Sequence, residues 1–200
     1  MNAMNVLPLQ IMGVATVLAV ALALWAGSGE AGARARMRRT FLAVDRLTSG
    51  AAAILATLAM AVAVAAGAWQ VVARFATETP SVWSEALVRT AIVWVAFIGV
   101  AVALRAGALV SIDVARRLSR GTVQRALEAA SLAAILSFLG VMFWFGWMMA
   151  ERVKFQEMAG LEVSMSWGYA AIPIGACFAM IGAIAHFLDR KPTDELETAL

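Results

Sequence analysis

Glu85 and Arg89 are the ionisable residues whose spacing is most informative in this chain. They stand four positions apart, which places them on one face of a helix where their side chains can form an ion pair. The charge-free run that follows, 90–104, has 15 residues. As a helix it would extend about 22 Å, less than the ~30 Å of bilayer hydrocarbon. A helix that spans the membrane must therefore include Arg89 and is expected to reach Glu85.

Two interpretations of this pair remain open. In the first, the pair marks a helix end and Arg89 extends toward the lipid headgroups. In the second, both side chains face protein, either other helices of this chain or a partner. Insertion scales give a charge at the membrane centre a cost of about 2.5–3.5 kcal/mol, which pairing near a helix end lowers.

The other reactive residue types form no catalytic or metal-binding pattern. Cys177 is the one cysteine and lies in an apolar run, which excludes a disulfide framework and a thiolate metal site. His186 is the one histidine and stands at the end of the last apolar run, where an interfacial residue is more common than a ligand. There is no paired His and carboxylate cluster, Gly-rich phosphate loop or nucleophile elbow. We therefore expect no enzymatic activity and no cofactor in this chain.

The composition is that of an integral membrane protein. Hydrophobic residues make up 62% of the chain and charged residues 14%, against about 25% charged in soluble domains. We expect the lipid bilayer, and no nucleic acid, as its surroundings. The predicted fold is all-α, a four-helix transmembrane core with an extra N-terminal transmembrane helix and a basic in-plane amphipathic helix. The expected spans are 6–26, 47–73, 83–104, 129–150 and 163–188.

The N-terminal span lacks the positive n-region of a signal peptide, so we expect it to cross the membrane. An alternative is a dispensable extension, since Met37 could begin a complete protein. The predicted organisation is an N-terminal extension at 1–33, a membrane domain at 34–190 and a short cytoplasmic tail at 191–200.

Between the first two spans, 27–46 is expected to be a polar, glycine-containing connector with five arginines. Ten of the 18 residues from 51 to 68 are alanine. Small side chains let membrane helices approach closely, so we expect protein around much of this helix. Ser81 is expected to cap the helix that follows the loop at 77–81.

Further along, Val110, Val114 and Leu118 recur at four-residue steps among arginines, which predicts a basic amphipathic helix at 110–126 lying on the membrane surface. A solvated polar loop is the alternative. The segment 151–162 is expected to be a short surface helix or a folded loop. Pro173 is expected to kink the last span near its middle. Every charged side chain is expected at or beyond a helix end.

One set of residues carries a resemblance to a known family. In order, these are Arg74, Trp83, Glu85, Arg89, Trp94, Phe97, Gly99, Arg105, Gly107 and Asp113, followed in the last span by Tyr169, Pro173 and Gly175. This pattern resembles the small, DctQ-like membrane subunit of tripartite ATP-independent periplasmic (TRAP) transporters, over about 37–188. Leu109 stands where the family commonly has histidine, and Met165 where a proline is frequent. With the N-terminal span, the chain is predicted to have one transmembrane helix more than the family's usual four.

The resemblance implies a role. In such systems a periplasmic substrate-binding protein captures an organic anion, and a large membrane subunit moves it inward by an elevator-like motion coupled to sodium. The small subunit is similar to a clamp that enlarges the static scaffold. The sodium coupling would belong to the large partner subunit, and the motif residues, Asp113 included, would form partner or structural interfaces.

Two other classes of protein remain as alternatives. A self-assembling small channel or exporter should line its lumen with polar side chains on one face of several helices, and the sequence shows no such face. A membrane enzyme would need clustered ionisable groups at one depth, and these are missing.

The distribution of positive charge predicts the topology. Twelve of the 16 lysines and arginines fall in 27–46, 105–125 and 190–191. The other four are Arg74, Arg89, Arg152 and Lys154. The positive-inside rule then places the first set, and the C-terminus, on the cytoplasmic side of a bacterial inner membrane.

Overall fold

The structure is a computed structural model that describes residues 7–27, 32–76, 79, 81–107 and 122–189. These residues are helical apart from connecting loops and one isolated antiparallel bridge between Glu157 and Ser164. The helices are α1 (Leu7–Gly27), α2 (Ala33–Ala76), α3 (Val82–Arg105), α5 (Thr122–Arg152), α6 (Ser166–Tyr169) and α7 (Ala171–Asp189). The all-α prediction is confirmed.

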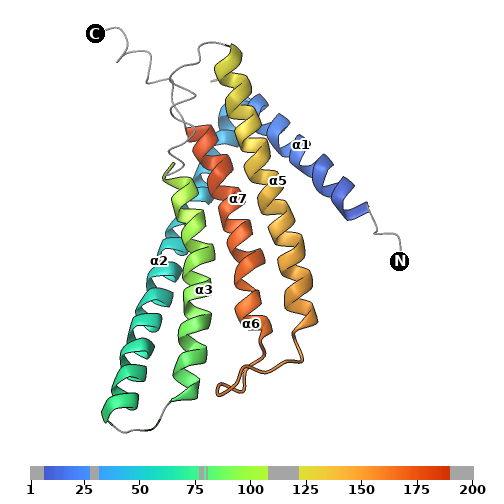
Figure 1. Ribbon diagram of the computed structural model, residues 1–200. Coiled ribbons are helices and arrows are strands. Elements are labelled where there is room, and N and C mark those ends of the chain that lie inside the picture. The colour runs from blue at the N-terminus through green and yellow to red at the C-terminus, as the bar shows by residue number, and fades with distance from the viewer. Residues whose placement is uncertain (1–6, 28–31, 77–78, 80, 108–121, 190–200) are drawn as a thin grey trace, which may run out of the picture.

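Four segments of the described chain are long and apolar enough to span a membrane, as expected for the transmembrane core. They are Ala35–Ala76, Val82–Arg105, Ala126–Arg152 and Ser166–Asp189. The N-terminal helix is present as α1, and its stretch from Gln10 to Trp25 counts as a shorter apolar helix. In Figure 1, α2 and α3 form one antiparallel pair, α7 lies between α3 and α5, and α1 crosses obliquely near the start of α5.

The second helix begins well before the predicted span. The segment expected to be a connector up to residue 46 is already helical from Ala33, so α2 has 44 residues and a length of about 66 Å. This is roughly twice the hydrocarbon thickness. The polar segment did not interrupt the helix because arginine and most of its neighbours there are acceptable helix formers.

Along α2, buried and half-buried positions recur in alternating steps of four and three residues. They are Asp45, Ser49, Ala52, Ala56, Ala59, Ala63, Ala66, Gln70 and Ala73. This is the spacing of a left-handed helix pair, and α3 is the main partner of α2. The rest of the alanine-rich part, 51–68, is exposed except for Gly67. The described part of this chain therefore covers only the α3-facing side of this helix, and protein around the rest of it would have to come from a partner.

Close contacts between α3, α5 and α7 form the centre of the bundle. An added Cβ on Gly175 of α7 would lie 2.6 Å from the Cβ of Phe97 and 2.8 Å from its carbonyl carbon. On Gly182 it would lie 3.0 Å from the Ala101 carbonyl oxygen. Glycine therefore lets α7 approach the backbone of α3, as small residues do in membrane helix pairs.

Pro173 acts at the start of the last helix and not at its middle. The helical part of the predicted span begins only at Ser166, and it is interrupted at Ala170, between α6 and α7. Proline has no N–H to donate to Tyr169, four residues earlier, so the helix breaks just before it. The Trp94 indole Nε1 donates to the Trp167 carbonyl oxygen at 3.1 Å, which attaches α6 to α3.

The segment after α5 is a folded loop, one of the two forms expected. Within it the Met158 N–H donates to Val163 at 2.8 Å and the Met165 N–H donates to Gln156 at 2.7 Å. Gly160 adopts φ +85 where the loop meets the backbone of Val82 and Trp83, so a side chain is disfavoured there. Residues 110–121 of the predicted in-plane helix lie outside the described residues, and 122–126 form the start of α5.

Candidate functional site

Arg105 joins three helices at one end of the bundle. Its Nε donates to Asp45 Oδ2 of α2 at 2.6 Å, and its Nη2 donates to Asp189 Oδ2 of α7 at 2.8 Å. Ser49 donates a further hydrogen bond to Asp45 Oδ1 at 3.0 Å. Arg105 ends α3, so this network connects α2, α3 and α7 through one guanidinium.

The burial of these groups differs sharply. Asp45 is 1% exposed, Arg105 28% and Asp189 48%. A buried carboxylate is costly unless it is paired and hydrogen-bonded, and Asp45 has both kinds of partner. The Asp45–Arg105 contact is therefore the one in this network that the fold depends on most.

The backbone around the network is also fixed. Arg38 of α2 donates from Nε to the Leu188 carbonyl oxygen at 2.9 Å, at the end of α7 where carbonyls lack helix partners. Gly107 follows α3 with φ +72, and its N–H donates to Leu104 at 3.2 Å. This is the left-handed helix ending that glycine favours. An added Cβ there would lie 2.5 Å from His186 Cε1, so α7 also restricts this position to glycine.

Asp45 was missed by the sequence analysis, and it contradicts the expectation that every charged side chain lies at or beyond a helix end. It sits inside α2, twelve residues after Ala33. A signal was available. Asp45 continues the seven-residue spacing of Ala52, Ala59 and Ala66, so it shares their face of the helix.

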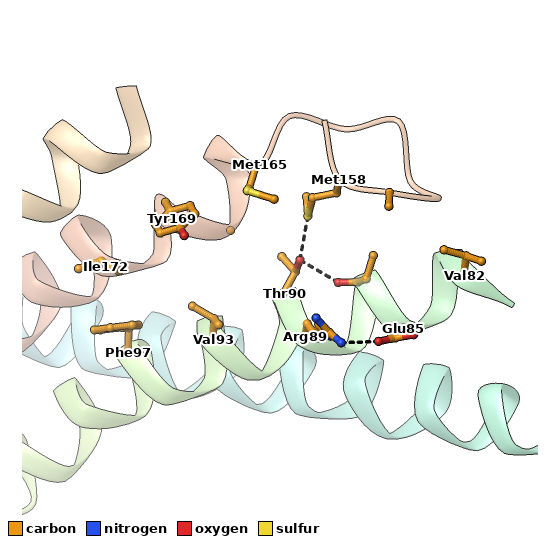
Figure 2. A pocket seen from close by; sticks show the side chains of 13 residues that line it. Val82, Glu85, Arg89, Thr90, Val93, Phe97, Met158, Met165, Tyr169 and Ile172 are labelled. Atoms are coloured by element: carbon orange, nitrogen blue, oxygen red, sulfur yellow. Dashed lines mark hydrogen bonds and ion pairs between the residues drawn. The ribbon is translucent and has the colours of Figure 1, made fainter. Parts of the chain in front are cut away.

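A cavity of about 590 Å³ lies at the other end of the bundle. Its walls are the first four turns of α3, the loop after α5, α6 and the start of α7, with Phe97, Met158, Tyr169 and Ile172 among the lining residues. Figure 2 shows Met158, Met165 and Tyr169 on the side facing α3, with Glu85 and Arg89 joined on α3 itself. Met165, which stands at the position of the expected proline, is part of this lining.

Glu85 and Arg89 form the predicted ion pair, and α3 includes both. Arg89 is 78% exposed and Glu85 is 49% exposed. Other helices of this chain therefore do not cover the pair. What remains of the two interpretations is contact with lipid headgroups or contact with a partner.

The other motif residues fall into two groups. Trp94 and Phe97 of α3 contact the α6–α7 segment at Trp167 and Gly175. Tyr169 lines the cavity beside α3, and Pro173 lies against Gly146 of α5. In contrast, Arg74 and Trp83 are exposed, and an added Cβ on Gly99 would meet nothing within 4 Å. Asp113 lies outside the described residues. The motif residues therefore do not form a single site. Those that the structure describes lie at the two ends of the bundle and on an open face of α3.

The titratable groups among the described residues form ion pairs at the two ends of the bundle. Nowhere among those residues do three His, Cys, Asp or Glu side chains gather closely enough to hold a metal ion. Ser81 stands at the N-cap position of α3, but its hydroxyl contacts the Ser84 hydroxyl and makes no capping bond to the backbone. What the two ends can do is hold helices together and bind charged partners.

Comparison with models of protein families identifies a match. The family model described as "Tripartite ATP-independent periplasmic transporters, DctQ component" matches residues 63–191. The matched range covers α3, α5, α6 and α7 and the last third of α2. No curated protein matches the chain at a significant level.

Proposed function

The chain belongs to the DctQ component family of tripartite ATP-independent periplasmic transporters, and we propose that it is the static scaffold of such a system. In this role it supports a large membrane subunit that takes up an organic acid delivered by a periplasmic binding protein, driven by sodium. The chain itself contributes no substrate site and no ion site.

The observation that carries this proposal is the distribution of ionisable groups over the spans. In the described residues, the apolar stretches 47–73, 90–104 and 129–150 hold no Asp, Glu, Lys, Arg or His. Transporters bind substrate and coupling ions near the bilayer midplane, where polar groups or broken helices must be available. Charged groups concentrated at the two ends of a helix bundle are consistent with a rigid, structural subunit.

Internal fastening supports the same role. The Arg105 network ties α2, α3 and α7 at one end, and the Trp94–Trp167 hydrogen bond ties α3 to α6 toward the other. Between them, Gly175 and Gly182 bring α7 against the backbone of α3. The moving domain of the large subunit requires a rigid support. These contacts provide rigidity because they resist relative sliding of α2, α3 and α7.

The partner surface is proposed to include the outer face of α2. Large apolar side chains are exposed on this face, among them Ile54, Leu58 and Val64. Lipid alone could cover such a face, so its assignment to the large subunit rests on the family. The orientation proposed has the Arg105 end in the cytoplasm of the bacterial cell, because the segments that flank this end in the sequence, 27–46, 105–125 and 190–191, hold 12 of the 16 lysines and arginines.

Copurification tests the proposal. The tagged chain is expressed together with the large membrane subunit encoded with it and is extracted in a mild detergent. We expect the large subunit to copurify in a fixed ratio, and an unrelated membrane protein of similar abundance to be lost. Recovery of this chain only with copies of itself would contradict the scaffold role and favour a self-assembling channel.

A further inference from the structure

The cavity beside α3 is elongated and has one charged end. Its wall on α3 runs from Val82 to Phe97, about 22 Å of helix. One leaflet contributes about 15 Å of hydrocarbon, so a cavity of this length extends from the interface deep into the leaflet. Glu85 and Arg89, both largely exposed, lie in the first half of this wall and are called the rim below, and Phe97 lies at the far end of the wall.

Beyond Arg89 the cavity wall is mostly apolar, with the Thr90 and Tyr169 hydroxyls as its polar side-chain groups. Thr90 lines it, but the Thr90 hydroxyl has two partners already, the Ala86 carbonyl oxygen at 2.9 Å and the Met158 sulfur at 3.2 Å. Val93 and Met165 continue the apolar surface on either side. A hydrocarbon chain can occupy such a space without leaving a buried polar group unsatisfied.

The rim has a specific charge pattern. Arg89 and Glu85 contact each other through Nη2 and Oε1, and both side chains are largely exposed. The other guanidinium donors and the second carboxylate oxygen of this pair are available to a ligand. Adjacent positive and negative groups complement a zwitterion, with a phosphate on the arginine and an ammonium that donates hydrogen bonds to the carboxylate.

We infer that this cavity is a binding site for a phospholipid with a phosphate and a primary ammonium in its headgroup, that is, a phosphatidylethanolamine. One acyl chain lies along α3 between Val93 and Met165, and the headgroup lies over Glu85 and Arg89. A phosphatidylcholine headgroup has a cation but no N–H to donate to Glu85, and a phosphatidylglycerol headgroup has hydroxyl donors but no cation, so neither forms a hydrogen-bonded ion pair with Glu85. The bound lipid would fill the gap between α3 and the α6 segment.

Native mass spectrometry of the full-length chain in mild detergent tests this assignment independently of any transport activity. The protein is delipidated and offered phosphatidylethanolamine, phosphatidylcholine and phosphatidylglycerol with identical acyl chains. We expect one phosphatidylethanolamine to be retained, about tenfold more tightly than either of the others, the usual effect of one charge-assisted hydrogen bond. Equal retention of the three lipids would overturn the inference.

Matched variants distinguish lipid binding at the rim from a general effect of surface charge. Arg89→Gln and Glu85→Gln should each lower phosphatidylethanolamine retention about tenfold, and Glu85→Gln should also remove the preference over phosphatidylcholine. Arg74→Gln and Glu151→Gln, exposed charges at the same end but outside the cavity, should leave retention unchanged. Arg89→Gln behaving like Arg74→Gln would refute the site.

The alternative occupant is a side chain or helix of a partner protein. A photo-crosslinking amino acid at position 93 distinguishes the two in cell membranes that contain the whole complex. An adduct that increases the mass of this chain by that of a phospholipid supports the inference. A crosslink to another polypeptide overturns it, because the cavity would then be part of a protein interface.

Discussion

Asp45 shows how one residue can determine the positions of three helices. Its carboxylate is buried against Arg105, and the same guanidinium reaches Asp189 on α7. Because the Asp45 carboxylate has almost no access to water, it depends on this partner, whereas Asp189 is about half exposed and can be hydrated instead.

Arg105→Ala should therefore be severely destabilising. It leaves the buried Asp45 carboxylate without its charged partner, and breaking such a pair from one side costs about 3–5 kcal/mol. Unfolding of the purified chain in detergent measures this cost. Asp189→Ala, which removes only the exposed partner, should cost about 0–1 kcal/mol. Adding Asp45→Ala to Arg105→Ala should recover part of the loss, and a double variant as unstable as the sum of the two singles would contradict the pairing.

The Glu85–Arg89 pair leads to the opposite expectation for stability. Both side chains are exposed in the isolated chain, so Arg89→Ala should change its free energy of unfolding by only about 0–1 kcal/mol. Assembly with the large subunit, or uptake by the complete system, should nevertheless fall strongly, because a partner or lipid is proposed to cover the pair there. Arg152→Ala, an exposed arginine at the same end that belongs neither to the motif nor to the cavity, serves as the matched control. If both variants assembled equally well, Arg89 would have no role beyond its contact with water and headgroups.

At the scale of the elements, the sequence predicts where the spans lie better than it predicts where the helices end. The hydrophobic runs at 83–104 and 129–150 correspond to α3 and α5 because burial in lipid requires an unbroken helix. The start of α2 was misplaced by about 14 residues, because polarity marks the edge of the membrane and not the end of a helix. The missing N–H of Pro173 explains why the helix is interrupted before this residue. The position of the interruption within the span was predicted wrongly because the helical part begins at Ser166 and not at 163.

The site was predictable to a similar degree. The i, i+4 spacing of Glu85 and Arg89 specifies their ion pair, since that contact is within one helix. The Asp45–Arg105 contact joins positions 60 apart, and only the packing of α2 on α3 brings them together. The cavity likewise depends on how the loop after α5 folds back over α3, which no local pattern indicates.

Two glycines of the motif should respond differently to alanine. An added Cβ on Gly175 would fall within 2.6–2.8 Å of Phe97, including its backbone, so Gly175→Ala must push α7 from α3 and should cost about 1–3 kcal/mol. Gly99→Ala meets nothing within 4 Å and replaces glycine inside a helix, so the isolated chain should be unchanged or more stable by up to about 1 kcal/mol. Thermal unfolding in detergent compares them directly. A loss of large-subunit binding by Gly99→Ala alone would assign this open face to the partner, and destabilisation of the isolated chain by Gly99→Ala would contradict the packing.

For the molecule as a whole, the two ends differ in charge as well as in structure. The segments that flank the Arg105 end along the sequence, 27–46, 105–125 and 190–191, hold 12 of the 16 lysines and arginines, and the cavity end carries Arg89, Arg152 and Lys154. We predict that the Arg105 end faces the cytoplasm. Single cysteines introduced at Ser119 and Thr79, with Cys177 replaced, should react with an impermeant thiol reagent from outside only at position 79. Labelling of position 119 in intact cells would reverse the topology.

The last expectation concerns transport by the whole molecule. Its charge-free stretches leave no evident site for an organic anion or a sodium ion at mid-depth, and its contacts fasten α2, α3 and α7 to one another. Purified chain in liposomes should therefore show no sodium-driven uptake of organic acids. Uptake should begin when the large subunit and the binding protein are added, and it should be absent when this chain alone is left out. Arg105→Ala should weaken uptake in the reconstituted system because a loosened scaffold no longer opposes the moving domain, whereas Asp189→Ala should retain most of it. Robust uptake by the chain alone would instead require a site formed between copies of itself, and the scaffold role would then be wrong.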